Sequence, residues 1–81
     1  MKLKLTQTMF LALVHIAEHG GEAIDGNRSL TRPTSAALYK RGYIERAGCG
    51  VMFLFERWRL TDGGREAIAW ARQNPADVVK R

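Results

Sequence analysis

The segment WRLTDGGREAI, residues Trp58–Ile68, changes from the pattern of a strand to the pattern of a helix. Up to Leu60, bulky apolar and charged residues alternate, which is typical of a strand with one buried face. Thr61 is placed to cap a following helix, and Asp62 puts negative charge where the helix dipole favours it. The segment therefore predicts a strand that ends at Leu60 and a helix that begins directly after Thr61.

We expect this helix to span residues 62–73. Its predicted apolar stripe consists of Ala67, Ile68 and Ala71, with Trp70 at the edge. Gly64 has no side chain, so the first turn of the helix can approach a neighbouring element closely. The pair Asn74-Pro75 ends the helix, and residues 74–81 form a tail without a clear pattern.

The residues before Leu60 predict a β-hairpin. One strand starts at Tyr43 and runs past Arg46, glycines on either side of Cys49 loosen the chain, and a second strand runs from about Phe53 to Leu60. One face of the second strand carries Leu54, Glu56, Trp58 and Leu60, and the other carries Phe55, Arg57 and Arg59. We expect Ile44 and Leu60 to face each other at the base of the hairpin.

Two more helices are predicted, at residues 6–19 and 32–41. Each has a threonine cap, Thr6 or Thr31, which follows a leucine that can pack on the first turn. Glycines end both helices. The exposed face of the second predicted helix is expected to carry Arg32, Thr34, Ser35 and Lys40. Between the two helices, Gly20–Ser29 is rich in residues that break helices, so a further helix there is either one turn near Glu22–Asp25 or absent.

Composition favours one domain with an anionic partner. The 81 residues include 13 Lys+Arg and 8 Asp+Glu, for a formal net charge of +5, and nucleic acid is the commonest partner of such a small basic domain. Cys49 is the only cysteine, so we expect no internal disulfide and a reducing, cytoplasmic location. No apolar run approaches the ~20 residues that span a bilayer, and the N-terminal residues are interpreted as mature structure.

The order of the predicted elements resembles that of a winged helix-turn-helix domain, in particular the multiple-antibiotic-resistance repressor type and its small bacterial and phage relatives. ALYKRGYIER, Ala37–Arg46, resembles the end of a recognition helix that runs into the wing. WRLTDGGREAI resembles the strand that leaves the wing and enters the last helix. The resemblance covers residues 5–73. It implies a small α+β winged helix with three helices, a hairpin wing and a shortened second helix.

The resemblance also implies a function, which is that of a DNA-binding transcriptional regulator, dimeric and without a cofactor. Its recognition helix, residues 32–41, would enter the major groove, and its wing, residues 43–60, would touch the backbone or the minor groove. The predicted DNA-binding residues are Arg28, Ser29, Thr31, Arg32, Thr34, Ser35, Lys40, Arg41, Arg46, Arg57 and Arg59. Each also has a purely structural interpretation: the hydroxyls cap helices, Lys40 and Arg41 oppose the helix dipole, and the wing arginines pair with Glu45 or Glu56.

The apolar run Val51–Phe55 lies where a DNA-binding wing is usually polar. Exposed, it would form an apolar patch of the kind that soluble monomers avoid. Three outcomes are open: Phe53 and Phe55 fold back on the core, the run forms a homodimer contact, or it docks another protein. The candidate interface residues are Val51, Met52, Phe53 and Phe55. The alternative function is accordingly a winged-helix adaptor that binds protein through this run.

Other chemistries find little support in the sequence. His15 and His19 have the helical spacing of metal ligands but lack a third ligand, and helix-dipole stabilisation explains a histidine near a helix end. A redox role for Cys49 would need a lowered pKa that nothing in the sequence provides. There is no catalytic set of residues, so we expect no enzyme activity. RNA binding rests on charge and aromatic content alone.

Overall fold

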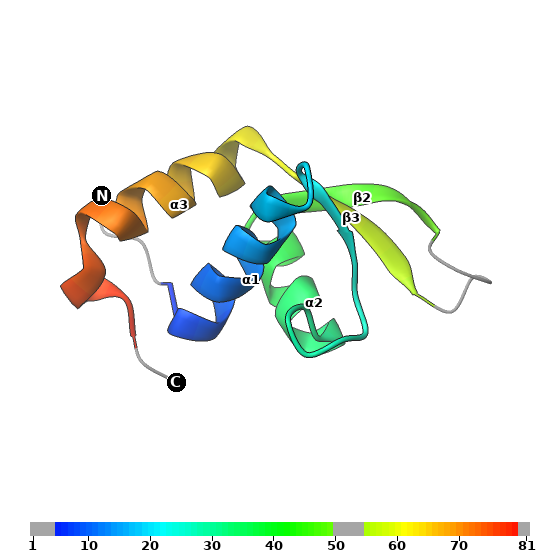
Figure 1. Cartoon of the computed structure of the whole chain (residues 1–81), viewed down its shortest axis with the longest axis horizontal. Helices are drawn as coiled ribbons and strands as arrows, with labels where there is room; N and C mark the ends of the chain where they lie inside the picture. Colours follow the sequence, from blue (N-terminus) through cyan, green and yellow to red (C-terminus); the bar gives the residue numbers. More distant parts are fainter. Residues whose placement is uncertain (1–4, 50–54, 80–81) are drawn as a thin grey trace.

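A computed structural model describes residues 5–49 and 55–79 of the chain as a small α+β domain (Figure 1). Its elements in chain order are α1 (Gln7–Glu18), β1 (Glu22–Ile24), α2 (Arg32–Lys40), β2 (Ile44–Cys49), β3 (Glu56–Leu60), α3 (Asp62–Gln73) and the short 3-10 helix η2 (Pro75–Asp77). The three predicted α-helices are confirmed to within one residue at each end. None of the helices in this part of the chain has the length and apolar character needed to cross a membrane.

Each α-helix begins directly after a threonine that caps it. The side-chain oxygens of Thr6, Thr31 and Thr61 accept hydrogen bonds from the backbone N–H three residues later, at 3.1, 3.4 and 3.1 Å. Such a bond satisfies one of the N–H groups that a helix leaves without a partner in its first turn. The three predicted caps are therefore confirmed.

The sheet is antiparallel, with β3 between β1 and β2. Ile44 pairs with Leu60, as predicted for the base of the hairpin, and Ala23 pairs with Trp58. Trp58 and Leu60 are buried while the arginines between and before them are exposed, so the alternation in the sequence sets which face meets the core. A bulge between Arg46 and Gly48 shifts the register of β2.

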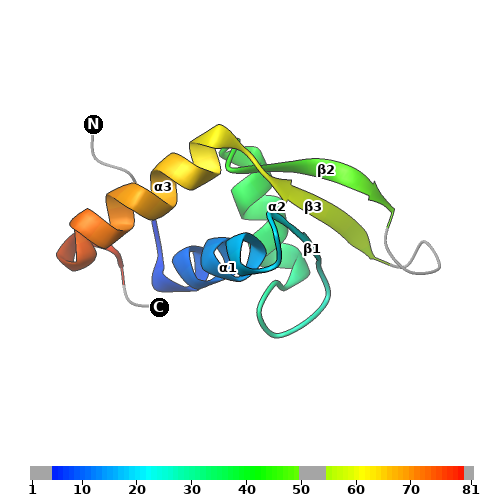
Figure 2. The same ribbon diagram turned by 45° about the horizontal axis from the view of Figure 1, so that its top comes forward.

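The predicted beginning of the second hairpin strand, about Phe53, lies outside the described residues, as do Val51, Met52 and Leu54. Within them the strand begins at Glu56, and Phe55 lies in a bend before it. The hairpin extends past α2, on the side of the molecule away from η2 and the start of α1 (Figure 2).

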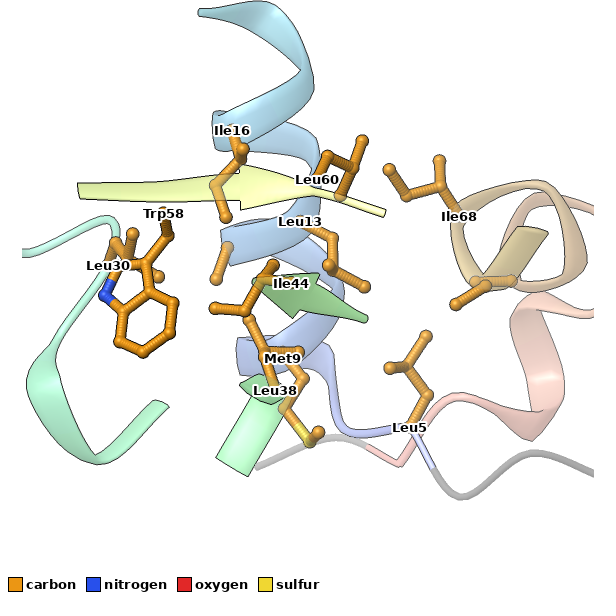
Figure 3. Packing of buried hydrophobic residues seen from close by; sticks show 13 residues of the cluster. Leu5, Met9, Leu13, Ile16, Leu30, Leu38, Ile44, Trp58, Leu60 and Ile68 are labelled. Carbon is orange, nitrogen blue, oxygen red and sulfur yellow. The ribbon is translucent and has the colours of Figure 1, made fainter. Parts of the chain in front are cut away.

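The core lies between α1, α2, α3 and one face of the sheet (Figure 3). Its fully buried large apolar side chains are Leu5, Leu13, Ile16, Leu30, Leu38 and Ile44. Gly64 allows α3 to start close to the sheet, because a Cβ at this position would overlap the carbonyl oxygen of Tyr43 and lie 2.7 Å from Leu60 Cδ1. The close approach predicted at Gly64 is thus confirmed.

A loop replaces a helix between β1 and α2. Residues 25–30 form bends only, so of the two alternatives for this segment the one-turn helix near Glu22–Asp25 is absent, and Glu22–Ile24 is a strand. Asn27 closes the loop: its amide nitrogen donates to the Ile24 carbonyl at 2.8 Å, and its side-chain oxygen accepts from the N–H groups of Ser29 and Leu30 at 2.9 and 3.0 Å. One side chain therefore supplies hydrogen bonds that a helix would have made with its own backbone.

The tail returns to the start of α1. Val79 forms a parallel bridge with Thr6. The Gln7 N–H donates to the Val79 carbonyl oxygen at 2.7 Å, and the Val79 N–H donates to the Leu5 carbonyl oxygen at 2.9 Å. Val78 packs against the core. The end of the described chain is thus part of the domain.

Candidate nucleic-acid interface

The outward side of α2 is the most cationic helical surface among the described residues. From Gly26 to Ile44 the chain carries four Lys/Arg residues and no Asp or Glu. The exposed residues of α2 are Arg32, Pro33, Ala36, Tyr39 and Lys40. Ala36 lies between the two cations of the helix and has a small side chain, so a flat ligand surface can come close to the helix there.

A hollow of about 590 Å³ lies between this side of α2 and the hairpin. We call it the α2–hairpin groove. Its cationic lining residues are Arg32, Lys40 and Arg46, and its aromatic lining residues are Tyr39, Phe55 and Trp58. Two successive elements, the helix and the hairpin, thus place three predicted DNA-binding cations around one concave surface.

Two aromatic rings of the groove contact each other, and all three lie near an arginine. The ring centroids of Tyr39 and Trp58 are 5.3 Å apart. The Arg46 guanidinium carbon lies 5.5 Å from the Tyr39 ring centroid and 6.0 Å from that of Trp58, while the Arg32 guanidinium carbon lies 5.5 Å from the Phe55 ring. These distances fall in the range of cation–π attraction.

Asp25, which is only 6% exposed, anchors the floor of the groove. Its Oδ2 accepts from Trp58 Nε1 at 2.9 Å and lies 3.2 Å from the Ser35 hydroxyl, and its Oδ1 accepts from the Glu56 N–H at 3.2 Å. A buried carboxylate is costly unless its oxygens are hydrogen-bonded, and here both are. Sequence analysis missed this residue, since only the fold brings β3 and α2 to the loop that carries it.

Ser35 corrects a prediction. The sequence predicts it on the exposed face of α2, but it is 1% exposed, and its one hydroxyl hydrogen can be donated either to the Arg32 carbonyl oxygen at 2.9 Å or to Asp25 Oδ2 at 3.2 Å. Its hydroxyl group therefore joins the Asp25 network. Polarity suggested the outward face, and the buried acceptor at Asp25 explains why a serine is stable inside.

Four other predicted residues lie on a different part of the surface. A second hollow, between α1, the loop and the beginning of α2, is lined by Thr8, Leu11, Val14, His15, Glu18, Arg28, Ser29, Thr31 and Thr34. Thr31 and Thr34 also interact with each other, Oγ1 to Oγ1, at 2.9 Å. Arg41, the last of the predicted α2 residues, is exposed at the C-cap of the helix and outside both hollows.

Arg57 and Arg59 lie on the outer face of the sheet, opposite the face that carries Trp58. Arg59 Nε is 3.7 Å from a carboxylate oxygen of Glu22, and its Nη1 is 3.7 Å from one of Glu45. The predicted pairing of a wing arginine with Glu45 is confirmed for Arg59. The structure thus separates these two arginines from Arg32, Lys40 and Arg46.

Of the predicted apolar interface, only Phe55 lies within the described residues. It is half-buried, and its ring lies against Gly26, where a Cβ would overlap it. Phe55 therefore packs on the loop of its own domain, although it is not part of the core cluster, and the prediction that Phe53 folds back on the core lies outside the described residues. The interface prediction for Val51, Met52 and Phe53 concerns residues outside the described part and stays a prediction.

The two histidines of α1 contact each other, with ring centroids 4.2 Å apart. Partial burial lowers the pKa of His15, and the neighbouring His19 charge lowers it further, against a smaller opposite effect of Glu18. His19 Nδ1 lies 2.8 Å from the His15 carbonyl oxygen. In residues 5–49 and 55–79, no group of three or more His, Cys, Asp or Glu side chains is arranged to hold a metal ion.

Comparison with known proteins leaves the domain defined by its fold alone. No family model matches the chain, and no curated protein or solved structure matches it significantly.

Proposed function

We propose that this domain binds duplex DNA through α2 and the neighbouring hairpin, as a transcriptional regulator of the winged-helix kind. The order of elements supports the proposal: β1 joins the hairpin in a sheet ordered β1-β3-β2, and α2 directly precedes the hairpin. A recognition helix followed by a wing has this order. The departure is the loop at residues 25–30, which stands where such domains have a further helix.

The observation that carries the proposal is the gathering of Arg32, Lys40 and Arg46 around the α2–hairpin groove. Two carboxylates line the same groove. Asp25 is buried, and both of its oxygens accept hydrogen bonds from the domain itself. The other acidic residue of the lining is Glu56. The groove therefore presents positive charge from two elements, as expected of a surface that meets phosphates.

The dimensions of α2 suit this role. A helix with its side chains is about 10–12 Å in diameter, which fits the major groove of B-DNA, about 12 Å wide, and the nine residues of α2 extend about 13 Å along it. Arg32 and Lys40 lie near its two ends, so they can reach phosphates or base edges while Ala36 and Tyr39 approach the bases. Arg28 and Ser29, exposed on the loop before α2, are placed for backbone contacts that fix the register.

The test is a fluorescence-anisotropy titration of the whole chain with random-sequence duplex DNA, at low and at near-physiological salt. We expect binding that weakens steeply with salt. Arg32→Ala should weaken binding by about 1 kcal/mol or more. The matched control is Arg72→Ala, which removes the same charge from the C-terminal turn of α3, away from the groove.

Equal losses in the two variants would show that net charge, rather than this surface, determines binding. No binding of the wild-type chain at low salt would overturn the proposal and make a protein-binding adaptor the leading interpretation. Light scattering on the same samples tests the predicted homodimer.

A further inference from the structure

Arg46 differs from the other cations of the groove in how it is held. It lies on β2 opposite Trp58, one position before the bulge, and its side chain is exposed. In an antiparallel pair, residues opposite each other point to the same face. Arg46 therefore points to the inner side of the hairpin, toward α2.

Two aromatic rings from two elements form a wall beside the Arg46 guanidinium. Trp58 is 4% exposed and fixed by its Nε1 hydrogen bond to Asp25. Tyr39, which is 47% exposed, contacts Trp58 from α2, and the guanidinium lies within 6.0 Å of both ring centroids. Contact with the rings restricts the orientations of the guanidinium without occupying its N–H groups.

The N–H donors of Arg46 are not consumed by the rest of the described chain. Within residues 5–49 and 55–79, its guanidinium forms no ion pair or hydrogen bond, although Glu56 lines the same groove. Arg59, on the outer face of the same hairpin, lies between two carboxylates instead. A guanidinium that is oriented but has free donors is prepared for an acceptor from outside the molecule.

We propose that Arg46 contacts DNA by donating two parallel hydrogen bonds to a planar pair of acceptors, and that Tyr39 positions it. This inference rests on the proposed function. Two sources on DNA offer such a pair: the N7 and O6 atoms of guanine, and two oxygens of one phosphate. The planar fork of arginine can reach both atoms of either pair at once, whereas the ammonium group of a lysine cannot form the same two parallel bonds.

The experiment uses the tightest-binding duplex that the wild-type chain selects from a random-sequence pool. A second probe is the same duplex with each guanine replaced by 7-deazaguanine, which lacks the N7 acceptor but keeps the charge and the pairing. Anisotropy gives the affinity of each probe for the wild-type chain, Arg46→Lys, Tyr39→Leu and Tyr39→Phe. Arg57→Lys, on the outer face of the same hairpin, is the matched control.

If guanine is the acceptor, the wild-type chain binds the unmodified duplex at least about fivefold more tightly than the 7-deazaguanine duplex, and Arg46→Lys loses this ratio. Tyr39→Leu should reduce the ratio, while Tyr39→Phe and Arg57→Lys keep it. If phosphate is the acceptor, the wild-type chain binds both probes equally and Arg46→Lys weakens both by a similar factor.

If Arg46→Lys binds both probes as tightly as the wild-type chain does, the role of Arg46 is overturned while DNA binding itself stands. An effect of Arg46→Lys that Tyr39→Leu does not share would overturn the positioning role of Tyr39. Failure of the wild-type chain to bind any duplex would remove the proposed function itself. The ratio compares two ligands on one protein sample, so it does not change when a variant is partly unfolded.

Discussion

Arginine side chains on the two faces of the β2–β3 hairpin have different surroundings. On the outer face, Arg59 lies 3.7 Å from each of two carboxylates, those of Glu22 and Glu45. On the inner face, Arg46 lies beside the Tyr39 and Trp58 rings, and the buried carboxylate of the groove, Asp25, accepts hydrogen bonds from other donors. The charge of Arg59 is thus balanced within the molecule, whereas the N–H donors of Arg46 are not used by the described residues.

This contrast shows that net charge alone does not locate a binding surface. Arg46, Arg57 and Arg59 look alike in the sequence, where all three are arginines on wing strands. Their positions in the strand register separate them, because neighbouring residues on a strand point to opposite faces. What surrounds each face then decides whether its cations are neutralised.

Loss of Asp25 should have the largest effect on the difference between the two faces, because its hydrogen bonds hold Trp58 and Glu56 on the inner face. Asp25→Ala would leave the Trp58 Nε1–H and the Glu56 backbone N–H without their acceptor, while the Ser35 hydroxyl keeps the Arg32 carbonyl oxygen, so the free energy of unfolding should fall by about 2–4 kcal/mol. Urea denaturation followed by tryptophan fluorescence measures the change. Asp25→Asn, which keeps one acceptor oxygen, should lower the free energy of unfolding by a smaller amount. A change below about 1 kcal/mol for Asp25→Ala would show that water replaces these bonds.

Gly64 tests whether stability and DNA binding can be separated. Gly64→Ala introduces a methyl group against the Tyr43 carbonyl and Leu60, at the junction of α3 with the hairpin base, and should destabilise the fold by about 1–3 kcal/mol. The affinity of the folded protein for DNA should be unchanged. Gly63→Ala is the control: its added Cβ would lie 3.3 Å from the Gly42 oxygen, and we expect a change within about 1 kcal/mol. Similar losses in the two variants would contradict the tight contact at Gly64.

The outer ion pairs should contribute little to stability. Glu45→Gln removes one carboxylate from Arg59, and both side chains are about half exposed. Exposed pairs of this kind are screened by water and salt, so the free energy of unfolding should change by less than ~0.5 kcal/mol. Thermal melts at low and high salt measure it. A large, salt-sensitive loss would mean that the outer face is held together by charge.

The smallest effect on stability is expected at His15, which lines a hollow together with Arg57 of the outer face. Burial lowers the pKa of His15 in the folded state below its ordinary value of 6.5. The unfolded chain then binds the proton more readily, so stability should be complete above this pH and fall as the pH drops below it. His15→Gln should flatten the curve between neutral and mildly acidic pH. An unchanged curve would show that other groups cause the dependence.

The sequence was sufficient to predict the elements whose signals are local. Threonine caps, stops at glycine or at Asn74-Pro75, and apolar spacing located all three α-helices, and alternation along the second hairpin strand separated its two faces. The candidate site was less predictable because its contacts join distant segments. Asp25 meets Trp58 across 33 positions and Ser35 across 10, so no local pattern shows that this acid is buried or that Ser35 is its partner. The separation of Arg46 from Arg59 likewise required the strand register.

The most direct measurement compares two double variants that remove the same charge from the two sides: Arg32→Ala with Lys40→Ala from the groove, and Arg57→Ala with Arg59→Ala from the outer face. Anisotropy with duplex DNA at low and near-physiological salt gives the affinity and the salt dependence of each. If the α2–hairpin groove binds DNA, the first pair weakens binding by at least about tenfold and reduces the salt dependence by about two phosphate contacts, while the second pair changes affinity much less. Equal losses, or a larger loss from the outer pair, would contradict the assignment of DNA binding to this groove.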